Sequence, residues 1–191
     1  RGGDTPAALM FQHQSPLGGW NPAQALLHQK IAPQYTNYGG ILACAADGTL
    51  YAGCHFYNLG KGDPSSAEAN QEIAQSHGAA VIKSTDSGAT WTDLSGTPLQ
   101  TPALYSENIA IPPLHSYVYI KGLAVDSKGN LWALTLKPAI DDKRILLSRW
   151  DKTTGWVTAD LQSVLPADRI AVDATMTIDT RDRIHLALCA V

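Results

Sequence analysis

A histidine and two tyrosines are the residue types in this sequence best suited to proton transfer. His55 ends a segment in which Tyr51 and Gly53 alternate with it, and a long polar stretch follows, so we expect His55 at a rim rather than in a core. Its imidazole titrates near neutral pH, which suits a group that gives or takes a proton. Tyr117 and Tyr119 are two residues apart in an apolar segment, so in a strand they point to the same face. A hydrogen-bonding histidine and packed aromatic rings remain open as the alternative interpretation.

His185 and Cys189 come closest to a metal-binding pattern. They are four residues apart in a predicted strand and share a face, which could supply half a zinc site. The sequence contains no second pair with close spacing, and Cys189 aligns with His55 in the repeat described below, so core packing is favoured. We expect no required cofactor, while a structural calcium or zinc ion stays open, with no ligands assigned.

The composition is that of an ordinary globular domain and limits the classes of partner. The 191 residues include 14 Lys plus Arg against 17 Asp plus Glu, for a net charge of -3, with no basic cluster. We therefore expect no nucleic-acid partner. No apolar run reaches the roughly 20 residues of a membrane span, so we expect no membrane partner. The first residues do not resemble a signal peptide.

Three hairpins repeat along the chain. Residues 41–52, 123–134 and 176–187 each read as an apolar strand, a short polar turn and a second strand with an aromatic residue or histidine at its third position. The turn residues are those that tight hairpins favour. Repeated hairpins at these intervals predict an all-β architecture built from similar sheets.

A second motif alternates with the hairpins. Ser84, Asp86, Gly88 and Trp91 form the pattern Ser-x-Asp-x-Gly-x-x-Trp, which resembles the Asp box of the BNR and sialidase-like β-propellers. Weaker copies occupy residues 148–156 and 15–20. We expect the carboxylate and hydroxyl of this motif to bond turn amides, the glycine to take a positive φ and the tryptophan to pack inward. These residues therefore predict a fold, not a reaction.

The alternation predicts a β-propeller of four-stranded antiparallel blades, with about three blades in this chain. The expected parts are an outer half blade at 7–31, a blade at 38–94 with a long loop at 57–78, a second blade at 117–162 and an inner half blade at 171–191. Residues 95–116 read as another long loop. Because known propellers close with four or more blades, we expect exposed blade edges to meet either a second copy or the remainder of a ring.

Two stretches carry a more specific resemblance. Residues 38–57, from Tyr38-Gly-Gly to Cys54-His55-Phe56-Tyr57, and residues 83–99 resemble the propeller-type ulvan lyases and their BNR-repeat relatives, and the likeness covers about 36–137. The resemblance implies cleavage of an acidic, uronate-containing polysaccharide by β-elimination, and a secreted or periplasmic protein. That reaction needs a base, an acid and a group that stabilises the uronate carboxylate.

The resemblance also implies roles for individual residues. His55 matches the family's catalytic histidine and His77 its second histidine. Tyr119, with Tyr117 as the alternative, matches the catalytic tyrosine. Lys137 stands where the family has its neutralising arginine, and lysine supplies the charge without the bidentate fork. Three residues beside the first stretch are expected to bind substrate: Asn37, Tyr57 and Asn58.

Two other functions stay open. One is a non-catalytic Asp-box propeller that binds glycan or protein. The other is a sialidase or glycoside hydrolase, which is less favoured because Ile109-Ala-Ile-Pro112 lacks the expected arginine and the arginines fall in turns or outer strands. A hydrolase would need two carboxylates at one rim, and the candidates are Glu107 and Asp126. Asp126 lies in a repeat turn, where a structural role is expected.

Overall fold

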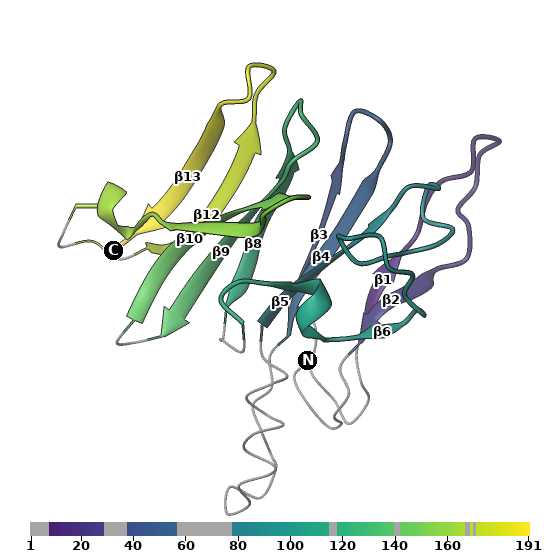
Figure 1. The fold of residues 1–191 in the computed structure, drawn as a ribbon, viewed down its shortest axis with the longest axis horizontal. Coiled ribbons are helices and arrows are strands. Elements are labelled where there is room, and N and C mark those ends of the chain that lie inside the picture. The colour runs from purple at the N-terminus through teal and green to yellow at the C-terminus, as the bar shows by residue number, and fades with distance from the viewer. Residues whose placement is uncertain are drawn as a thin grey trace, which may run out of the picture.

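The fold is described from a computed structural model, which places residues 8–28, 38–56, 78–114, 118–139, 142–166, 169 and 171–191. In these ranges the regular structure is β, apart from two single turns of 3-10 helix, η1 (Glu107–Ile109) and η2 (Gln162–Val164). None of these helical segments is long and apolar enough to cross a membrane. The strands form four sheets that stand side by side (Figure 1).

Two of the sheets are four-stranded and antiparallel, as expected for propeller blades. The first contains β3 (Tyr38–Cys44), β4 (Leu50–Phe56), β5 (Gly78–Ser84) and β7 (Ala110–Ile111), in that order. The second contains β8 (Tyr119–Val125), β9 (Leu131–Ala139), β10 (Asp142–Asp151) and β11 (Gly155–Asp160), with β8 innermost. We call them blade A and blade B.

The two remaining sheets flank these blades. At the N-terminal side, β1 (Ala8–Phe11) pairs antiparallel with β2 (Gln24–His28), and β6 (Ala103–Leu104) adds to β2 in parallel. At the C-terminal side, β12 (Ala171–Ile178) pairs with β13 (Ile184–Ala190). The strands β3, β8 and β12 lie next to one another, β8 being in contact with both neighbours. The all-β propeller architecture predicted from the repeats is confirmed.

The segment 95–116, predicted to be a loop, contains regular elements within its described residues 95–114. These residues contribute β6 to the N-terminal sheet, the η1 turn, and β7 as the fourth strand of blade A. A four-stranded blade ending at residue 94 needs its fourth strand near Thr92, but the structure has isolated bridges there, from Thr92 to Lys83 and to Pro98. Blade A therefore extends past residue 94, because its fourth strand is the two-residue β7, whose Ala110 and Ile111 pair with β5.

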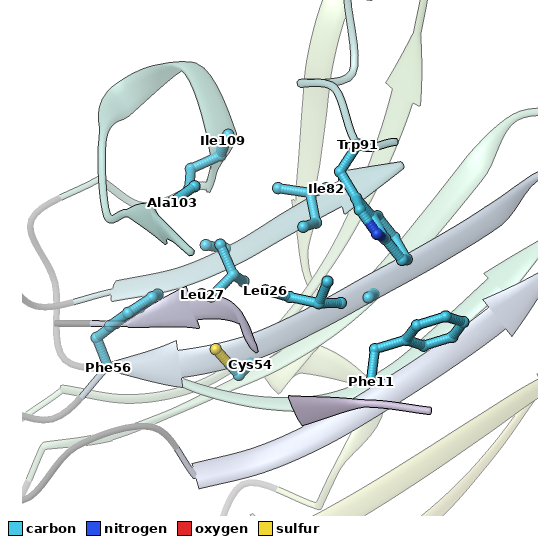
Figure 2. Packing of buried hydrophobic residues seen from close by; sticks show 11 residues of the cluster. Phe11, Leu26, Leu27, Cys54, Phe56, Ile82, Trp91, Ala103 and Ile109 are labelled. Atoms are coloured by element: carbon cyan, nitrogen blue, oxygen red, sulfur yellow. The ribbon is translucent and has the colours of Figure 1, made fainter. Parts of the chain in front are cut away.

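Three apolar clusters lie between successive sheets and fix their stacking. The cluster between the N-terminal sheet and blade A includes Phe11, Leu26 and Trp91, all at most 8% exposed (Figure 2). A second cluster joins blades A and B through Val81, Ile120 and other residues. A third joins blade B to β12 and β13. Burial of apolar surface between sheets thus aligns the ends of all strands at two rims.

The two rims of the stack differ in construction. The hairpin turns at residues 45–49, 126–130 and 179–183 all lie at one rim, which we call the turn rim (Figure 1). The starts of β3, β8 and β12, together with the end of β4, lie at the other rim, which we call the loop rim. The candidate chemical groups divide between these rims.

Candidate functional site

His55 and Tyr119 meet at the loop rim. His55 lies near the end of β4, where it pairs with Tyr38 at the start of β3, and Tyr119 is the first residue of β8. Because β3 and β8 are adjacent, the two side chains come together although 64 residues separate them in sequence. Their ring centroids are 4.8 Å apart with an interplanar angle of 77°, an edge-to-face contact. The structure thus brings the two predicted proton-transfer residues into contact.

A glycine makes room for the His55 ring. Gly39 has a φ of +66°, and a Cβ added there would lie 2.9 Å from both Nδ1 and Cε1 of His55. This edge of the imidazole therefore lies directly against the Gly39 backbone. A larger residue at position 39 would displace the ring from Tyr119.

Burial keeps His55 in its neutral form. Only 5% of the residue is exposed. Desolvation, together with the charge of Lys121, lowers the pKa of His55 from 6.5 to about 4. At neutral pH the imidazole is therefore uncharged and has one nitrogen able to accept a proton or hydrogen bond. His55 lies near a strand end at the loop rim, but its side chain is buried rather than open to solvent.

Lys121 is a further member of this site that the sequence interpretation missed. Its Nζ lies 5.3 Å from the Tyr119 ring centroid and 2.7 Å from Oδ1 of Asp173. The hydrogen bond from Lys121 and the amide of Ala174 lower the pKa of the Asp173 carboxyl. Asp173 belongs to β12, so groups from three successive sheets converge at the loop rim. The available signal was a lysine two residues after Tyr119 in an otherwise apolar strand.

Lys137 lies on β9, one residue beyond Leu136, which pairs with Tyr119. It is partly buried and lies opposite Arg144 on β10. The Arg144 guanidinium makes an ion pair of 3.6 Å with Asp160. An arginine, Arg144, therefore lies beside Lys137, on β10 rather than on β9, where the family's arginine was expected. The role of Lys137 as the neutralising cation stays a prediction.

Five of the predicted site residues lie outside the described part of the chain: Asn37, Tyr57, Asn58, His77 and Tyr117. Their proposed roles stay predictions. Tyr119 lies beside His55, and the second cluster includes its neighbour Val118.

The 84–91 corner has the hydrogen bonds that its sequence predicts. Ser84 Oγ donates to Asp86 Oδ1 at 2.7 Å and accepts from the Gly88 amide at 2.8 Å. Thr90 donates to Asp86 through its amide and its hydroxyl, and these bonds, with the one from Ser84, lower the pKa of Asp86 to about 2. Trp91 donates to the Gly88 carbonyl and is 1% exposed. These contacts give the corner a local structural role.

The two weaker copies do not repeat this geometry. Asp151 accepts from the amides of Thr153 and Thr154, but Ser148 bonds to Thr158 across the β10–β11 hairpin instead of to Asp151. At the N-terminal copy the Trp20 side chain is 66% exposed and does not pack inward. Only the 84–91 corner closes in the predicted way.

In the second and third hairpins, the aromatic residue or histidine after the turn bonds to the aspartate that begins the same turn. Trp132 Nε1 lies 3.0 Å from Asp126 Oδ2, and His185 Nε2 lies 3.1 Å from Asp179 Oδ2. Asp126 Oδ1 also accepts the amides of Lys128 and Asn130, which commits this carboxylate to the turn. Asp126 therefore has the structural role expected for it and is a poor candidate for a catalytic carboxylate of a glycoside hydrolase.

His185 and Cys189 are both exposed, because they lie on the face of the β12–β13 sheet that points away from blade B. Within the described residues, no group of three or more His, Cys, Asp or Glu side chains is placed to hold a metal ion. All three cysteines are free, and burial raises the pKa of Cys54.

Comparison with known proteins supports the fold. No family model matches the chain, and no curated protein matches it. A solved structure of the polysaccharide lyase Uly1 is similar, with a TM-score of 0.58 and 14% identity over 100% of this chain and 45% of that one. A protein of unknown function from Dyadobacter fermentans DSM 18053 is also similar, with a TM-score of 0.57 and 15% identity over 96% of this chain and 51% of that one. The chain thus spans about half the length of these structures, which it resembles in fold.

Proposed function

We propose that this chain forms part of a secreted, BNR-type propeller that cleaves a uronate-containing polysaccharide, such as ulvan, by β-elimination. The contact between His55 and Tyr119 at the loop rim is the observation that carries the proposal. The fold shared with the polysaccharide lyase Uly1 supports a carbohydrate-active protein. The resemblance of residues 36–137 to the propeller-type lyases supplies the reaction class.

The reaction breaks two bonds of the substrate and needs two proton transfers. The proton on C5 of the uronate, α to the carboxylate, goes to a base, and the electron pair left behind forms the C4–C5 double bond. The C4–O bond breaks, and the leaving glycosidic oxygen receives a proton. The protein must also stabilise the negative charge that builds on the carboxylate as the C5 proton leaves.

The residues at the loop rim can meet each of these needs. The Tyr119 phenol is less buried than His55 and is the group better placed to touch the polymer. His55, neutral beside it, serves as the second proton-transfer group. The Nζ of Lys121 lies 5.3 Å from the Tyr119 ring centroid. Lys121 and Lys137 together stabilise the negative charge on the substrate carboxylate. None of these proposed steps uses a cofactor.

The test is the ultraviolet absorbance of the unsaturated uronate that a lyase produces. The protein is incubated with ulvan and with other uronate polysaccharides, and the absorbance is followed with time. We expect a rise with the wild type and at least a 100-fold lower rate for Tyr119→Phe and for His55→Gln, the range that loss of a general acid or base produces.

A matched variant controls for the loss of an imidazole elsewhere. His28→Gln removes an imidazole on β2. This variant is expected to keep the wild-type rate. A wild type that produces no absorbance with any polysaccharide, while binding one of them, would contradict the lyase proposal and favour the non-catalytic glycan-binding propeller.

A further inference from the structure

A polar cleft at the turn rim lies apart from the candidate lyase site. It has a volume of about 510 Å³ and opens between blade A and blade B. Its walls are the turn of the first hairpin, the turn of the second hairpin and the end of β10. Thr49 in this cleft directly precedes β4, and His55 is six residues further along, which is about 20 Å at 3.3 Å per residue. The cleft therefore lies at the opposite rim from the His55–Tyr119 contact.

Three lysines from three different segments line this cleft: Lys83, Lys128 and Lys152. Within the described residues none of them lies within ion-pair distance of a carboxylate. Lys83 donates to the carbonyl of Leu94, and both burial and the charge of Lys152 lower its pKa. Two ammonium groups from neighbouring blades thus repel one another across the cleft, and an anion between them would relieve that repulsion.

The carboxylates of the cleft are used for another purpose. Asp47 accepts from the amide of Thr49, and Asp151 accepts from the amides of Thr153 and Thr154. These bonds lower the pKa of both carboxyls, because they favour the charged form. The aspartates therefore hold the turns in shape while keeping their charge. Asp47 attracts Lys152 and Asp93 attracts Lys83 from beyond ion-pair distance, so the lysine ammonium groups stay available for a closer anion.

Aromatic and hydroxyl groups complete the cleft. Trp150 is partly buried and lines it together with Tyr51. Ring faces of this kind pack against the C–H surface of a pyranose, while Thr49, Thr85 and Thr153 can bond its hydroxyls. Cations, a ring face and hydroxyl partners occur together in one hollow of suitable size for one or two sugar units.

We propose that the cleft at the turn rim is a second saccharide-binding site, which takes an acidic sugar through its sulfate or carboxylate group. Lys83, Lys128 and Lys152 bind the anionic group, and Trp150 supports the sugar ring. Such a site would hold a polymer on the opposite rim from the His55–Tyr119 contact. It does not depend on the proposed lyase activity, because a binding propeller would use it equally well.

The test uses ulvan oligosaccharides that have been incubated with the protein until no further change occurs, so that cleavage cannot interfere. Binding is measured by calorimetry at physiological ionic strength for the wild type, for the double variant Lys128→Gln/Lys152→Gln, and for Arg181→Gln. Arg181 is the matched control, since it occupies the same position in the third hairpin turn as Lys128 does in the second, outside the cleft. We expect about a tenfold weaker Kd for the double variant and no change for Arg181→Gln.

Two further ligands test the chemistry of the site. Maltohexaose, which is neutral, is expected to bind at least about tenfold more weakly than the ulvan oligosaccharides. Inorganic sulfate is expected to bind more weakly still, because it lacks the ring that Trp150 supports. Equal binding of maltohexaose or of sulfate would overturn the proposal of an acidic saccharide.

Amide chemical shifts of the wild-type protein locate the site without any substitution. We expect titration with the oligosaccharides to shift the amides of residues 47–49, 127–130 and 152–153. An unchanged affinity in a folded double variant would overturn the proposal, and so would shifts confined to residues 119–121. Shifts confined to residues 119–121 would instead place binding at the loop rim. A lack of absorbance change in the lyase assay would contradict the lyase proposal but not the saccharide site at the turn rim.

Discussion

The buried imidazole of His55 makes the stability of this protein depend on pH in a defined window. Burial and Lys121 lower the pKa of His55 from 6.5 to about 4, whereas in the unfolded chain the pKa returns to 6.5. Between these two values the unfolded state binds a proton that the folded state excludes. The neutral histidine therefore contributes stability that is present above pH 6.5 and is lost as the pH falls toward 4.

The size of this loss follows from the two pKa values. Each unit of pKa difference corresponds to about 1.4 kcal/mol, so the full effect is about 3.4 kcal/mol, reached below pH 4. Between pH 7 and pH 4.5, protonation of the unfolded state alone is expected to remove about 2.5 kcal/mol from the free energy of unfolding. For a domain with a total of about 5–15 kcal/mol, this change is large.

Chemical denaturation at pH 7, 6, 5 and 4.5 measures this loss, with His55→Gln as the reference. The variant keeps the aspartates with lowered pKa, such as Asp86 and Asp179, so their titration cancels in the comparison. We expect the wild type to lose about 2.5 kcal/mol more than the variant over this range. Parallel curves for the two proteins, or a His55 ring proton that titrates near pH 6.5 in the folded state, would refute the reasoning.

Two further predictions concern the packing of the sheets. Gly88 has a φ of +91° and a Cβ there would collide with the Phe11 ring, whereas Gly48, with a φ of +86°, has open space around it; thermal unfolding should show Gly88→Ala to be destabilised by about 3 kcal/mol and Gly48→Ala by about 1 kcal/mol. Leu134 is fully buried between blade B and β12–β13, whereas Leu17 is 98% exposed; Leu134→Ala should cost about 3 kcal/mol in urea unfolding and Leu17→Ala less than about 0.5 kcal/mol. Equal effects within either pair would contradict the packing described.

The hairpins could be predicted from the sequence because the signals that make them are local. A polar turn of a few residues with Gly48 or Gly129 at the positive φ fixes each hairpin without help from distant residues. The third hairpin has Asp182 at the same place, with a φ of +59°, and its carboxylate accepts the amide and hydroxyl of Ser127 from the second hairpin. A residue that departs from the repeat is thus explained by a contact between neighbouring sheets.

The groups around Tyr119 could be predicted only in part, because their meeting depends on the stacking of the sheets. His55 and Tyr119 were assigned to one site because of the resemblance to the propeller-type lyases. Their spacing in the sequence does not predict that they are in contact. The ion pair between Lys121 and Asp173 joins two innermost strands of different sheets, and a register shift between Ile120 and Gly122 changes which residues of β8 share a face. Alternation along the strand therefore could not assign Lys121 to the site.

The position of His55 within the repeat argues that the fold does not require a histidine there. Counted from the turn residues at 48, 129 and 182, the same position carries His55, Leu136 and Cys189. Leu136 is 2% exposed and fills the core between two sheets, so an apolar side chain satisfies the packing at this place. A buried imidazole costs solvation free energy that leucine would not cost. Together with the glycine that makes room for it and the tyrosine that it contacts, this cost favours a chemical role for His55 over a packing role.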